Sequence, residues 1–209
     1  MRSIAKLIKN KWHYRVIILL CYNLFTIFVF VSCTLFETRE PEDPNADTKR
    51  LPPPTTPDIL IDNFIESIKS KDIENYIACF HKTNYLFIAS NDAITKFPSL
   101  FDKWQIDNER SCFLAFTTSI GKLASINLTF SNRNFETIST DSAILITNYS
   151  LNYDSQNIIN QPDKYIGKLA LTLLPVEGGL WTISRWQDFT VSNDTIKDTW
   201  SHLKAYFHN

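Results

Sequence analysis

The spacing of the apolar residues changes at Gly121, and this change restricts the chain to folds that place helices before a sheet. Between Thr56 and Phe80, apolar residues recur every three or four positions in two runs separated by Ser70-Lys71-Asp72, which predicts two amphipathic helices. After Gly121 the period becomes two, as in half-buried strands. Helices followed by strands predict an α+β fold, with the N-terminal helices packed in a strongly curved antiparallel sheet.

The ends of these elements carry recognisable signals. Thr56-Pro57-Asp58 is a strong helix start, with a capping Thr, a Pro at the first helical position and an acid that meets the helix dipole. A third helix is expected to start around residues 107–110 and to continue through Cys112, Phe113 and Phe116. The predicted strands cover residues 124–130, 145–153, 165–174 and 180–189, and residues 175–179 make the last two a hairpin.

The residues before this domain predict export and anchoring. All five basic residues of positions 1–15 precede the uncharged, mainly apolar run of residues 16–32, the order found in secretory signals. Phe30-Val31-Ser32-Cys33 follows and resembles the lipobox of bacterial lipoproteins, although Phe30 departs from the usual leucine. The resemblance implies a signal peptide over residues 1–32, lipid on Cys33 and membrane binding through that lipid. The length of the apolar run also fits an uncleaved transmembrane anchor, so this alternative stays open.

Residues 33–56 predict a tether. The segment 34–56 holds five of the nine prolines and five acidic residues and shows no hydrophobic period. The folded domain is therefore expected to cover residues 57–209. The resemblance to bacterial lipoproteins implies a place in the cell envelope. Thr34 rather than aspartate follows Cys33, so the inner-membrane retention signal of enterobacterial lipoproteins is absent, which favours the outer membrane of a host with two membranes.

Charge and cysteine content exclude several classes of function. The remaining 16 basic residues and all 22 acidic residues follow position 33, and an acidic body argues against nucleic-acid binding. Cys79 and Cys112 lie in apolar surroundings typical of buried free thiols, with one disulfide as the alternative. No His or Cys pair has metal-ligand spacing, and no phosphate-binding loop is present, so we expect neither metal nor cofactor.

Two parts of the domain resemble the nuclear transport factor 2-like superfamily, the cone fold shared with ketosteroid isomerase-like and polyketide cyclase-like proteins. These parts are the Lys71-Asp72 turn followed by Tyr76 and Phe80, and the strand Gly179-Leu180-Trp181-Thr182-Ile183. The resemblance covers about residues 57–190 and supports the fold more than any activity. Residues 199–206 resemble the tail of lipid-anchored bacterial members, and Trp200, Leu203 and Phe207 predict a helix docked on the domain, with a partner-binding helix as the alternative.

The resemblance places candidate pocket residues at the mouth and inside of the cone. They are Tyr76, Phe80, Tyr85, Trp104, Trp186 and Asp188. The aromatic members also suit an ordinary core. Asp188 is expected to be a solvated strand-end carboxylate on the face opposite Arg185, unless a bulge intervenes, and His81 is expected to close the second helix.

No residue pattern states a reaction. The sequence therefore predicts a membrane-anchored extracytoplasmic lipoprotein whose domain binds a small apolar ligand or a protein without catalysis. The alternative is a pocket enzyme of the isomerase, dehydratase or hydrolase type, which needs a carboxylate or His with a perturbed pKa deep in the cone. A homodimer formed through the outer sheet face is a further expectation.

Overall fold

The computed structural model describes residues 51–154, 158, 161–191, 196 and 198–208, together with Leu19 and Tyr22. The chain divides into two compact units, Met1–Lys49 and Arg50–Asn209. The expected signal peptide apart from Leu19 and Tyr22, the expected lipid site Cys33 and most of the expected tether lie outside the described residues. Within the described part of the chain, no helix combines the length and the apolar character needed to cross a membrane.

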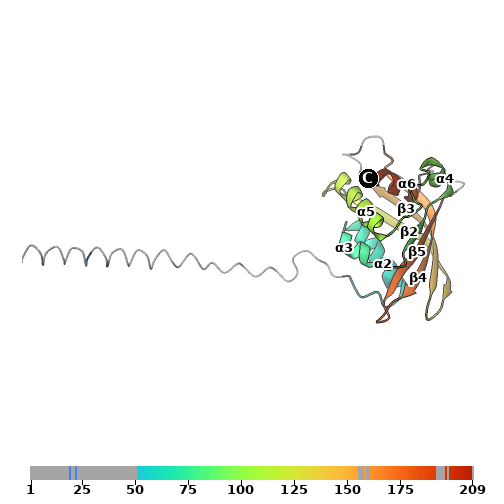
Figure 1. Ribbon diagram of the computed structural model, residues 1–209, viewed down its shortest axis with the longest axis horizontal. Helices are drawn as coiled ribbons and strands as arrows, with labels where there is room; N and C mark the ends of the chain where they lie inside the picture. The colour runs from blue at the N-terminus through green and yellow to red at the C-terminus, as the bar shows by residue number, and fades with distance from the viewer. Residues whose placement is uncertain are drawn as a thin grey trace, which may run out of the picture. The chain divides into compact units, whose positions relative to one another are not determined.

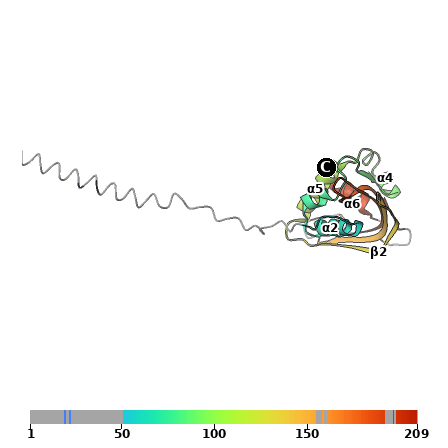
Figure 2. The same ribbon diagram turned by 90° about the horizontal axis from the view of Figure 1, so that it is seen from below.

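The second unit is an α+β domain, as the change of period predicts. Its helices are α2 (Pro57–Lys69), α3 (Ile73–Ala78), α4 (Asn91–Lys96), α5 (Ile106–Ile120) and α6 (Trp200–Phe207). Its strands are β1 (Leu86–Ile88), β2 (Ile126–Ile138), β3 (Ala143–Tyr153), β4 (Lys164–Pro175) and β5 (Trp181–Phe189). Figure 1 shows the order of these elements, and Figure 2 shows the strands curving around α2 and α6.

The described strands form one sheet in the order β1-β5-β4-β3-β2. Neighbours from β5 to β2 are antiparallel, whereas β1 runs parallel to β5. The expectation of an antiparallel sheet is therefore confirmed for β2 to β5 and is wrong for β1. A parallel pair needs a long connection between its strands, and here that connection includes most of the domain, so no local pattern marks it.

A bulge in β5 turns four large side chains toward the helices. Thr172 pairs with Arg185 and Leu173 with Ile183, which leaves Ser184 as an extra residue. Ile183 and Trp186 consequently lie on the same face, and Trp186 packs edge-on against Phe64 of α2 with ring centroids 5.4 Å apart. The inner-face residues of β5 are Trp181, Ile183, Trp186 and Asp188, all buried.

Helix ends largely follow the sequence signals. Thr56 caps α2 by accepting a hydrogen bond from the Ile59 amide at 3.3 Å, and Asp72 caps α3. Helix α3 ends at Ala78, so His81 lies beyond it, and its Nδ1 accepts the amides of Thr83 and Asn84 in the next turn. The expectation that His81 closes the helix is wrong by one turn.

The apolar stripe of α6 docks on the domain as expected. Trp200, Leu203 and Phe207 are each no more than 5% exposed. Trp200 packs edge-on against Trp186, with ring centroids 4.7 Å apart, and Phe207 contacts Phe116 of α5. Helix α6 therefore fills the space between the curved sheet and α5.

Candidate functional site

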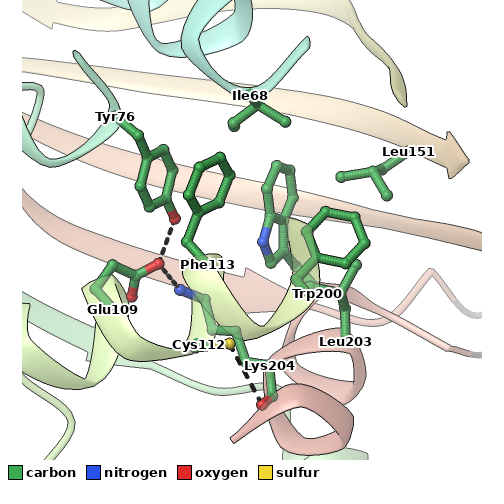
Figure 3. Close-up of a pocket in the computed structure, with 10 residues that line it drawn as sticks. Ile68, Tyr76, Glu109, Cys112, Phe113, Leu151, Trp200, Leu203 and Lys204 are labelled. Atoms are coloured by element: carbon green, nitrogen blue, oxygen red, sulfur yellow. Dashed lines mark hydrogen bonds and ion pairs between the residues drawn. The ribbon is translucent and has the colours of Figure 1, made fainter. Parts of the chain in front are cut away.

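A buried carboxylate, Glu109, lies at the centre of the cone and is only 2% exposed. It belongs to the first turn of α5, where a negative charge meets the positive end of the helix dipole. Its Oε2 accepts hydrogen bonds from Trp104 Nε1 at 2.7 Å and from Tyr85 Oη at 3.0 Å. Its Oε1 accepts from Tyr76 Oη and from Lys204 Nζ, which converge on it in Figure 3.

Lys204 reaches this carboxylate from α6 and is 1% exposed. Its Nζ lies 4.2 Å from the ring centroid of Trp186, 4.3 Å from that of Phe87 and 5.3 Å from that of Trp104. Aromatic faces attract a cation, and Glu109 supplies the opposite full charge. The ammonium group of Lys204 is thus held in an aromatic cage that is closed by a carboxylate.

The hydroxyls of Tyr76 and Tyr85, beside Glu109, are weaker acids than a tyrosine in water. Burial and the neighbouring negative charge of Glu109 raise the pKa values of Tyr76 and Tyr85 well above the usual value. Both hydroxyls therefore stay protonated and donate hydrogen bonds to the Glu109 carboxylate.

The cone has almost no free space at this point. The cavity beside Glu109 measures about 10 Å³, roughly the space needed for one water molecule. Side chains of α6 form part of its lining, namely Trp200, Leu203 and Lys204, together with Cys112 and Phe113 of α5. Figure 3 shows how these side chains crowd the space between α5 and the sheet.

The structure divides the predicted pocket residues into three groups. Tyr76, Tyr85 and Trp104 contact Glu109 directly. Phe80 lies in the aromatic core between Tyr76 and Trp186, with ring centroids 5.0 and 6.4 Å away, and Trp186 forms one wall of the lysine cage. Asp188 belongs to a second polar cluster beneath the start of α6.

Asp188 is buried, so the expectation of a solvated carboxylate is wrong. Its Oδ1 accepts from Tyr149 Oη at 2.8 Å, and its Oδ2 accepts from the Ser201 amide at 2.8 Å and from Ser201 Oγ at 2.5 Å. Burial raises the pKa of Asp188, while the hydrogen bonds from Ser201 and Tyr149 act in the opposite direction. Arg185 lies on the other face of β5, as strand alternation predicts.

A glycine in β4 makes room for this cluster. Gly167 pairs with Tyr149 across the sheet, and a Cβ at Gly167 would lie 2.7 Å from Cζ of Tyr149 and 2.8 Å from the carbonyl oxygen of Phe189. The absence of a side chain lets the Tyr149 ring lie flat over β4 and deliver its hydroxyl to Asp188.

Sequence reasoning missed Glu109 and Lys204, although both carried a signal. Glu109 stands three, four and seven residues before Cys112, Phe113 and Phe116, on the apolar face of its helix. Lys204 stands four residues after Trp200, on the apolar stripe of α6. An acid and a base on the apolar faces of two helices indicate a buried pair, because each needs the other to leave water.

The cysteines of the domain and the described acidic and histidine residues offer no metal site. Cys79 and Cys112 are free and buried, so the disulfide alternative is not formed, and burial raises the pKa of each thiol to about 12. Across the described residues, no group of three or more His, Cys, Asp or Glu side chains is arranged to hold a metal ion.

In the described residues, one curved sheet surrounds α2 and α6 (Figure 2). This is the arrangement of helices packed in a curved sheet that the resemblance to the nuclear transport factor 2-like superfamily implies. No family model matches the chain, and no curated protein matches it. The solved structures that match the chain include proteins described as ketosteroid isomerase-like and NTF-2 like, in line with the predicted resemblance.

The solved structures that match this chain are distant in sequence. A ketosteroid isomerase-like protein from Erwinia carotovora atroseptica is 11% identical, with 65% of this chain and 93% of that chain covered and a TM-score of 0.46. ActVI-ORFA from Streptomyces coelicolor is 11% identical, with 62% and 90% covered and a TM-score of 0.47. An NTF-2 like protein of unknown function from Shewanella oneidensis is 11% identical, with 62% and 93% covered and a TM-score of 0.37. At these identities the similarity concerns the fold alone.

Proposed function

We propose that this chain is a lipid-anchored protein of the bacterial cell envelope, and that its nuclear transport factor 2-like domain binds a small ligand or a protein without catalysing a reaction. The observation that supports binding without catalysis is the pairing of Glu109 with Lys204. The carboxylate at the centre of the cone is neutralised by a residue of the same chain.

A pocket enzyme needs a charged group that faces a space large enough for a substrate. The cavity beside Glu109 measures only about 10 Å³. Both carboxylate oxygens of Glu109 already accept hydrogen bonds from side chains of the same chain. Asp188 likewise accepts its hydrogen bonds from Tyr149 and Ser201. These contacts favour a binding domain over an isomerase, dehydratase or hydrolase.

Thiol labelling of the full chain in detergent tests whether the cone stays closed. Cys112 lines the cone cavity and Cys79 does not, while burial raises both thiol pKa values to about 12, so the two thiols are matched in intrinsic reactivity. We expect N-ethylmaleimide to label both at the same slow rate, set by unfolding, and Lys204→Ala to accelerate both, because the unpaired Glu109 charge destabilises the domain. Much faster labelling of Cys112 than of Cys79 in the wild-type chain would favour the enzyme alternative.

The anchoring half of the proposal rests on Val31-Ser32-Cys33 directly after the apolar run. Two or three acyl chains at Cys33 would hold the protein on a membrane almost permanently, at about 0.8 kcal/mol per buried methylene. Metabolic labelling with an alkynyl palmitate should mark the wild-type chain and a Cys21→Ser control but not Cys33→Ser. A mature chain that retains residues 1–32 with an unmodified Cys33, seen by mass spectrometry, would replace the lipoprotein by a signal anchor.

A further inference from the structure

We draw no further inference here: the strongest candidate, the groove of about 210 Å³ between β1, α4 and the turn of residues 97–102, has charges of both signs beside its aromatic lining, Asp102 and Lys96, and nothing in the described part of the structure shows what covers it.

Discussion

Asp188 and Glu109 are both almost inaccessible to solvent, yet they meet different partners. Glu109 faces the full charge of Lys204, whereas Asp188 accepts hydrogen bonds from an amide and two hydroxyls. Both sets of partners include residues of α6. The two carboxylates therefore anchor one helix, which accounts for their burial without a reaction.

Asp188→Asn should lower the free energy of unfolding by about 1–3 kcal/mol. The new amide NH₂ group would face a group that now donates a hydrogen bond to Asp188, and two donors cannot bond to each other. Asp163→Asn, at an exposed position before β4, should change it by no more than about 0.5 kcal/mol. Urea denaturation measures both. Equal stability of the two variants would show that Asp188 does not anchor α6.

At the scale of elements, α6 depends on the groups that satisfy its first amides. The Thr199 amide donates to His202 Nδ1 at 3.1 Å, and the Trp200 amide donates to Tyr149 Oη at 2.6 Å. Burial lowers the pKa of His202 below its ordinary value of 6.5. Lys96 acts in the same direction, and the nearby carboxylates of Asp198, Asp188 and Asp92 act against it.

The lowered pKa of His202 makes the stability of the domain depend on pH. Because the pKa of His202 is lower in the folded state, the unfolded chain binds the proton first, and stability should be full above about pH 6.5 and fall as the pH drops toward the lowered value. A protonated Nδ1 also loses the acceptor that caps α6. Urea melts at pH 7.5 and 5.5 should show this fall in the wild-type chain and in His81→Asn, and a smaller fall in His202→Asn. An equal fall in all three would assign the effect to other groups.

The elements that could be predicted from the sequence are the long periodic ones. The apolar residues of α2, α5 and α6 recur at helical spacing, and those of β3 alternate, because each element buries one face. Strand β1 has three residues, too few to show a period, and helix α4 buries Ala93 alone, so it has no apolar stripe. The parallel pairing of β1 and the bulge at Ser184 depend on partners distant in the chain, so no local pattern reports them.

At the scale of the whole molecule, the domain includes residues before α2. Asn63 Nδ2 donates to the Pro52 carbonyl at 2.7 Å, and the Trp181 amide donates to the Pro54 carbonyl at 2.8 Å. A chain that starts at Arg50 should therefore melt at the temperature of the longer chain, and one that starts at Pro57 should melt several degrees lower. Calorimetry compares them, and equal melting temperatures for all three would show that these two bonds contribute nothing.

The candidate site could be predicted only in part. Large aromatic residues are typical of a domain interior, and this made it possible to predict Tyr76, Tyr85 and Trp104. The pairing of Glu109 with Lys204 was not, because it joins residues 95 positions apart through the docking of α6. Local periodicity shows which face of a helix is buried and cannot show which buried charge meets which.

The central claim is that Glu109 and Lys204 form a paired structural unit, and a double-mutant cycle tests it most directly. Either single change, Glu109→Gln or Lys204→Met, leaves one buried charge unpaired and should lower the free energy of unfolding by about 3–5 kcal/mol. The double variant should recover most of this loss, with a coupling energy of at least about 2 kcal/mol in urea denaturation. A Glu109→Gln variant more stable than the wild-type chain, as expected when a strained functional carboxylate is neutralised, would contradict the account.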